Sequence, residues 1–82
     1  MLEDGKDNLC GRVSSVKEFG EKIRSKRKML GLTLKHVAGL SGIGARYLSE
    51  LERGKSTIEM GKALRVANSL GLELIVQPRS LQ

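Results

Sequence analysis

The segment 33–54 (TLKHVAGLSGIGARYLSELERG) constrains the fold more than any other part of the chain. Ala38 is small enough to let two helix axes approach closely, and Gly42 can take the positive φ that most side chains resist. Leu48 and Leu51 follow three residues apart, as on the buried face of a second helix. This spacing predicts two short helices joined by a tight turn. The faces that the turn brings together would bury Val37, Ile43, Leu48 and Leu51.

The two helices are expected over residues 34–41, where Thr33 can act as the cap, and over residues 44–52, which Gly54 closes. The second helix would keep its N-terminal turn exposed. A helix presented in this way can enter the major groove and contact base edges. The spacing therefore predicts that the chain binds duplex DNA.

The distribution of charge favours the same prediction. The formal net charge is +6, and seven Lys and Arg against two Glu give residues 17–35 +5 of it. A basic stretch directly before the paired helices favours phosphate contacts, although an ordinary solvated face is the alternative. The basic residues are Lys17, Lys22, Arg24, Lys26, Arg27, Lys28 and Lys35.

Length and composition exclude several classes of protein. A domain of 82 residues buries only ~60% of its unfolded surface, so we expect a dimer. One His, the single Cys10 and scattered carboxylates form no nucleophile–base pair and no metal set, so we expect neither an enzyme nor a metal or cofactor. No long apolar run predicts a signal peptide or a membrane span, and we therefore expect a cytoplasmic protein.

Helix signals flank the central segment on both sides. Ser15 and Glu18 form a capping-box pattern, which predicts a helix from near Val16 to the glycine at position 31. Ser56 and Glu59 form another, which predicts a helix through about residue 70. Gly61 inside that helix costs ~1 kcal/mol and could mark the close approach of another backbone. The apolar stripe of this last helix comprises Met60, Ala63, Leu64, Ala67 and Leu70.

The segment 72–77 (LELIVQ) alternates like a half-buried strand, and Pro78 ends it. A single strand in a helical chain lacks a partner for its backbone groups, so we expect it to pair with the same strand of a second copy. An extended tail lying on its own domain is the alternative. The expected dimerisation residues are Leu72, Leu74, Ile75 and Val76. The chain thus divides into a flexible tail (1–14), a helical domain (15–71), a dimerisation strand (72–77) and a short tail (78–82).

Residues 15–77 resemble the Cro/C1-type helix-turn-helix family, named after the Xre repressor, and within it are most similar to HipB-like antitoxins. The matching stretches are IRSKRKMLGLTL, HVAGLSGI, YLSELERGK and TIEMGKALRVANSLGLEL. The resemblance implies an all-α, lambda-repressor-like bundle that forms a homodimer on a palindromic operator. It also implies autoregulation of its own operon and, as a partner, a HipA-like kinase toxin that it neutralises in a type II toxin–antitoxin system.

Carried over from the family by position, the third helix would face the DNA. Arg46 is the best candidate for reading a base, because its guanidinium can donate two parallel hydrogen bonds to guanine. Tyr47 is expected to pack or to touch a phosphate, and Arg53 either pairs with Glu52 or contacts a phosphate. The full set of expected DNA-binding residues is Arg27, Lys28, Thr33, Lys35, Gly44, Ala45, Arg46, Tyr47, Ser49, Glu50 and Arg53.

The chain also departs from the family pattern. Leu34 replaces a glutamine that often holds a phosphate, and Gly44 and Ala45 replace residues that often contact bases. Glu50 stands where a basic residue is common, and its carboxylate would repel phosphate unless it accepts a hydrogen bond from cytosine. Specificity could then depend more on phosphate contacts and DNA shape. The sequence predicts a sequence-specific repressor, with a protein-interaction module that has lost operator binding as the alternative.

Overall fold

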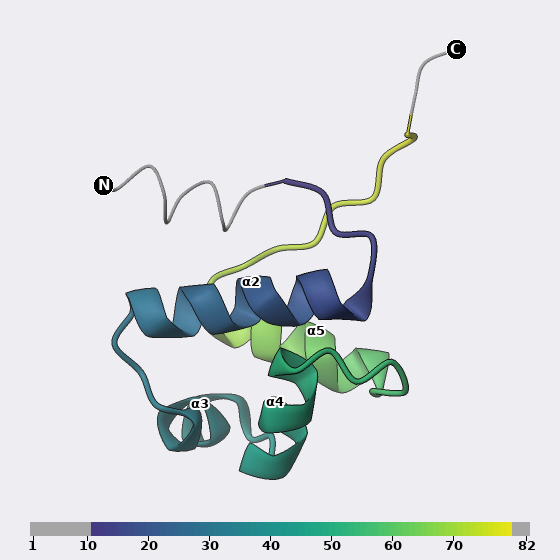
Figure 1. Cartoon of the computed structure of the whole chain (residues 1–82). Helices are drawn as coiled ribbons and strands as arrows, with labels where there is room; N and C mark the ends of the chain where they lie inside the picture. Colours follow the sequence, from purple (N-terminus) through teal and green to yellow (C-terminus); the bar gives the residue numbers. More distant parts are fainter. Residues whose placement is uncertain (1–10, 80–82) are drawn as a thin grey trace.

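The computed structural model describes residues 11–79, so Cys10 and most of the predicted N-terminal tail lie outside the described residues. The described part has an all-α fold (Figure 1). None of its helices is both long and apolar enough to span a bilayer. In chain order its helices are α2 (Val16–Met29), α3 (Leu34–Ser41), α4 (Ala45–Glu52) and α5 (Met60–Ser69). The first three begin and end within one or two residues of their predicted positions.

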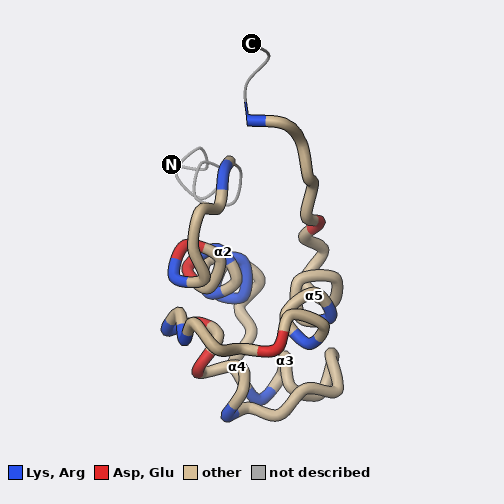
Figure 2. The backbone as a smooth tube through the Cα atoms, turned by 90° about the vertical axis from the view of Figure 1, so that its right-hand side faces the viewer, with Lys and Arg blue, Asp and Glu red and all other residues tan. Residues whose placement is uncertain are grey.

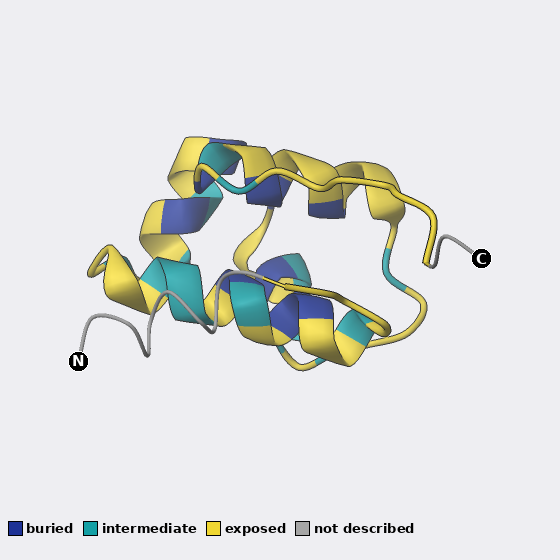
Figure 3. Cartoon of the chain, turned by 90° about the horizontal axis from the view of Figure 1, so that it is seen from above, coloured by how far each residue is buried: buried dark blue, intermediate teal, exposed yellow. Residues whose placement is uncertain are grey.

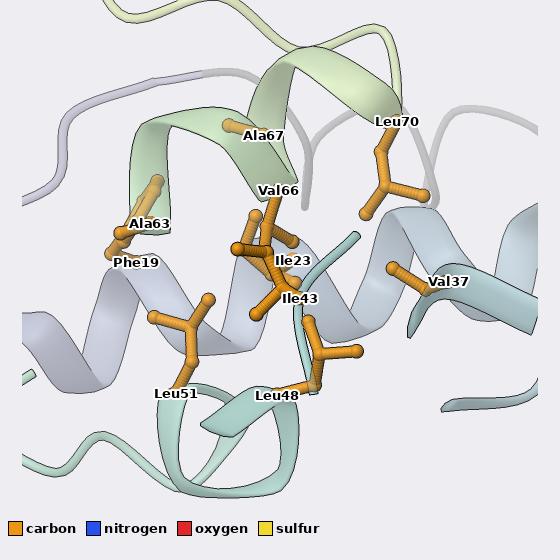
Figure 4. Packing of buried hydrophobic residues seen from close by; sticks show 10 residues of the cluster. All are labelled: Phe19, Ile23, Val37, Ile43, Leu48, Leu51, Ala63, Val66, Ala67 and Leu70. Carbon is orange, nitrogen blue, oxygen red and sulfur yellow. The ribbon is translucent and has the colours of Figure 1, made fainter. Parts of the chain in front are cut away.

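The helices enclose a hydrophobic core, aliphatic except for Phe19, to which all four contribute (Figure 4). Helix α4 packs on α2 and α3, and α3 also packs on α5. The four residues expected around the turn, Val37, Ile43, Leu48 and Leu51, are all buried, which confirms the predicted pairing of α3 and α4. The remaining core residues are Phe19, Ile23, Ala63, Val66, Ala67 and Leu70.

The helix ends follow the predicted capping residues closely. Gly42 ends α3 with φ of +74°, a conformation that costs a glycine little. Thr33 Oγ1 accepts a hydrogen bond from the backbone N–H of His36 at 3.1 Å, and His36 Nδ1 accepts one from the Thr33 N–H at 3.2 Å. At the start of α2, the Ser15 hydroxyl accepts a hydrogen bond from the Glu18 N–H and so caps the helix. The Glu18 carboxylate accepts a hydrogen bond from the backbone N–H of Ser14 rather than from that of Ser15.

The prediction for the last helix needs two corrections. Helix α5 begins at Met60 after Glu59, without a side-chain cap, so the expected capping box at Ser56 is wrong. Its buried face includes Val66, whereas the predicted stripe residues Met60 and Leu64 are exposed. The buried face of α5 is therefore rotated relative to the predicted stripe. Positions 63, 66, 67 and 70 recur at i, i+3, i+4 and i+7 and form the side of α5 that packs on α3.

Close backbone approach occurs at Gly20, not at Gly61. A Cβ on Gly20 would clash with the carbonyl oxygens of Leu51 and Glu52, so this glycine lets α2 and α4 touch. A Cβ on Gly61 would meet only the Glu59 carboxylate, 3.0 Å away. The suggested reason for Gly61 is therefore not found.

The segment after α5 leaves the helical bundle as an extended chain (Figures 1 and 3). Leu72 packs against the core, but Val76 is 98% exposed and residues 72–78 form no strand. A strand needs a partner for its N–H and C=O groups, and the described part of one chain supplies none. The predicted strand is thus not present in the single chain, and its pairing across a dimer stays a prediction.

Candidate nucleic-acid interface

The first turn of α4 projects from the bundle while the opposite side of the helix is anchored in the core. Leu48 and Leu51 are fully buried, and Gly44 precedes the helix without capping it through a side chain. Arg46 lies on the outer side with its side chain 94% exposed. The first turn of α4 is exposed, as the spacing predicted. It can therefore present the Arg46 guanidinium to the major groove of DNA.

Glu50 lies one turn further along the same helix and holds two cations. Its Oε2 is 3.7 Å from Arg46 Nε and 3.4 Å from Lys55 Nζ. Its side chain is 21% exposed, so the carboxylate is half-buried beneath the outer face of α4. Lys55 is missing from the predicted DNA-binding residues. Its position directly after the glycine that closes α4 is the sequence signal that could have identified it.

Tyr47 ties α4 to the loop before α5. Its hydroxyl donates a 2.6 Å hydrogen bond to the Glu59 carbonyl oxygen, and Lys62 Nζ lies 5.6 Å from the ring centre. Burial, and secondly the charge of Glu59, raise the pKa of the Tyr47 phenol. The packing role expected for this residue is present.

Arg27 and Glu52 form an ion pair that joins α2 to α4. Arg27 Nε and Nη2 donate to the Glu52 carboxylate at 2.7 and 3.0 Å, and Nη1 donates to the Leu32 carbonyl at 2.8 Å. The side chains are only 12% and 7% exposed. The hydrogen bond to Glu52 raises the pKa of Arg27, against the lowering effect of burial.

This ion pair corrects two predictions. Arg27 is not available to a phosphate, because its guanidinium is turned inward and holds Glu52 and Leu32. Arg53 is not the partner of Glu52 but lies exposed at the end of α4. Helix packing decides this pairing, since Arg27 and Glu52 are separated by 25 residues and only the contact of α2 with α4 brings them together.

The other predicted residues lie on or near the surface. Ser49 is half-buried. Thr33 is exposed, and its hydroxyl caps α3. Lys and Arg are spread along α2 and over the end of the molecule formed by α3 and α4 (Figure 2). The exposed members of the predicted set are Lys28, Thr33, Lys35, Gly44, Ala45, Arg46 and Arg53. Within residues 11–79, no group of His, Cys, Asp and Glu is arranged to hold a metal ion.

Comparison with known proteins points to one family. A helix-turn-helix family model matches residues 23–76. The chain is similar to the uncharacterized HTH-type transcriptional regulator y4mF of Sinorhizobium fredii, with 35% identity over 66 residues, 80% of this chain and 87% of the relative. It is also similar to an uncharacterized HTH-type transcriptional regulator of Haemophilus influenzae, with 30% identity over 79% of this chain and 64% of the relative. For the HTH-type transcriptional regulator DdrOP3 of Deinococcus deserti, the identity is 36% over 63% of this chain and 40% of the relative.

Proposed function

The chain belongs to the helix-turn-helix family, and from this membership we propose that it is a sequence-specific, DNA-binding transcriptional repressor. The observation that carries the proposal is the exposed Arg46 on the first turn of a helix whose other face is buried. The net charge of +6 and the names of the relatives as transcriptional regulators support it. The proposed activity is binding without catalysis, and its place is the cytoplasm.

In the proposed complex, α4 enters the major groove. Arg46 donates to guanine O6 and N7, while Lys28, Lys35, Arg53 and Lys55 supply phosphate contacts that set the orientation. Glu52 does not meet the DNA in this arrangement, because it faces α2. The ion pair with Arg27 instead holds the position of α4.

We further propose that two copies bind together, through residues 72–77. Exposed Leu74, Ile75 and Val76 would be covered when the two segments pair around a twofold axis. Two α4 helices about one helical turn of DNA apart would then match a palindromic operator.

The finer assignment is to a HipB-like antitoxin that represses its own operon and neutralises a HipA-like kinase toxin. The resemblance of residues 15–77 to that group supports this assignment. A kinase-like reading frame beside the gene, followed by inhibition of that kinase in a purified complex, would test it. A neighbouring frame of another class and no inhibition would restrict the function to repression.

The proposal is tested by replacing Arg46 with alanine. We expect about 1–3 kcal/mol weaker binding to a duplex selected from a random pool by the wild type, and a relaxed preference at one base pair. Fluorescence anisotropy at several salt concentrations measures both affinity and the number of phosphate contacts. Unchanged affinity and base preference would remove Arg46 as a reader.

A protein-interaction module that has lost operator binding is the second candidate. Gly44 and Ala45, which offer no polar side chain to a base, favour it. In that case the wild type would show little affinity for duplex DNA at any salt concentration.

A further inference from the structure

Of the two carboxylates on α4, Glu50 lies on the same side of the helix as Arg46, where it is half-buried. Residues 45–55 contain two carboxylates, and Glu52 is turned toward α2, where Arg27 holds it. Glu50 instead lies between Arg46 and Lys55, at 3.7 and 3.4 Å. A negative charge therefore stands inside the surface that is proposed to meet DNA.

This charge opposes binding to DNA of any sequence. Duplex DNA carries one negative charge per ~1.7 Å of its axis, so a carboxylate at the interface is repelled by phosphates. The carboxylate also loses its water in the complex, which costs free energy unless another donor replaces that water. Phosphate positions do not depend on sequence, and the penalty is therefore general.

Glu50 also competes with phosphates for the two cations that it holds. Arg46 is 94% exposed and Lys55 about half-exposed, so both could turn toward DNA. While they face the carboxylate, part of their charge is neutralised. A partner for Glu50 in the groove would remove this competition, and in the major groove the amino group of cytosine is the donor that suits a carboxylate.

From these contacts, and resting on the proposed function, we infer that Glu50 is a specificity-determining residue. It lowers the affinity for duplex DNA in general and is tolerated where the groove offers a cytosine amino group beside the base that Arg46 reads. Selectivity then comes from a penalty on wrong sequences as well as from a favourable contact with the right one.

The variant Glu50→Gln tests this inference, because it removes the charge and keeps the shape. The probes are a short duplex that the wild type enriches from a random pool and a random-sequence duplex of equal length. We expect Glu50→Gln to bind the random duplex about three- to tenfold more tightly and to gain less on the enriched one. On the random duplex, the slope of log affinity against log salt should steepen by about 0.9, as for one more phosphate contact.

Glu21→Gln is the matched control, since it changes the net charge equally and lies outside both the proposed DNA-binding residues and residues 72–77. Glu21 is exposed on α2, beside Glu18 and Ser25, whereas α4 packs on the side of α2 that carries Gly20 and Arg27. For Glu21→Gln, the ratio of affinities for the two duplexes should equal that of the wild type, and its molar mass and melting temperature should be unchanged.

Two results would overturn the inference. One is an unchanged affinity ratio in Glu50→Gln, and the other is an equal change in Glu21→Gln, which would reduce the effect to net charge. Both leave a selective wild type, so the proposed function would stand. A wild type without salt-dependent affinity for either duplex would instead overturn the proposed function itself.

Discussion

At the scale of single residues, two carboxylates on one short helix have different roles because they face different neighbours. Glu52 is turned into the molecule and takes two hydrogen bonds from Arg27. Glu50, two positions earlier, is half-buried between the two more exposed cations Arg46 and Lys55. In the sequence, both are glutamates in the second half of the same short helix, so their different roles cannot be read from it. The difference in exposure predicts that they contribute unequally to stability.

Glu52→Gln should lower the free energy of unfolding by about 1–3 kcal/mol, because it weakens charged hydrogen bonds and leaves Arg27 poorly paired. Glu50→Gln should change it by less than about 1 kcal/mol, since its partners Arg46 and Lys55 are 94% and 52% exposed and ion pairs with solvated cations contribute little. Denaturation in urea, monitored by circular dichroism, measures both variants. Equal effects of the two substitutions would show that the Arg27–Glu52 pair does not hold the helices.

At the scale of elements, the position of α4 depends on close packing against α2. Gly20 is buried on α2, and a side chain there would collide with backbone carbonyls at the end of α4. At Gly54, which has φ of +83°, an added Cβ would lie 2.6 Å from the Cα of Lys17 on α2. Both glycines therefore set the distance between the two helices, and only Gly54 stands where a sequence rule for helix ends anticipates a glycine.

Gly20→Ala should lower the free energy of unfolding by about 1–3 kcal/mol, because the new methyl group must push α2 and α4 apart. Gly39→Ala is the matched control: it lies within α3, has an ordinary φ, and a Cβ there meets nothing within 4 Å. This control should be neutral or stabilise by up to ~1 kcal/mol through helix propensity. Thermal and urea unfolding of both variants test the difference, and a stable Gly20→Ala would show that the helix contact can shift without cost.

At the scale of the whole molecule, an exposed apolar segment follows a small bundle that has its own core. Leu72 still packs on that core, and its N–H donates to the Ala67 carbonyl at 2.9 Å. Beyond it, Leu74, Ile75 and Val76 are exposed. The boundary between the packed domain and the exposed segment therefore lies after Leu72, within the stretch 72–77 that the alternation assigns wholly to a strand.

A chain ending at Glu73 should be monomeric in solution, because it keeps Leu72 and loses the three exposed apolar residues. A chain ending at Gln77 is the control and should remain a dimer. Molar mass from light scattering measures the outcome. A dimer of the shorter chain would place the interface on another surface.

The sequence by itself determined the paired helices α3 and α4, their capping residues and the core positions around their turn. These features depend on spacing of three and four residues and on the backbone freedom of Gly42, which are local properties. The spacing also predicted that the N-terminal turn of α4 would be exposed, and the family resemblance placed Arg46 on it.

Only the tertiary structure decided which distant groups meet. Arg27 became the partner of Glu52, Gly20 the point of closest helix contact, and Val66 part of the buried face of α5. Each depends on the distance and rotation of one helix against another, which the packing of all four helices sets together. Spacing along a single helix carries no information about those two quantities.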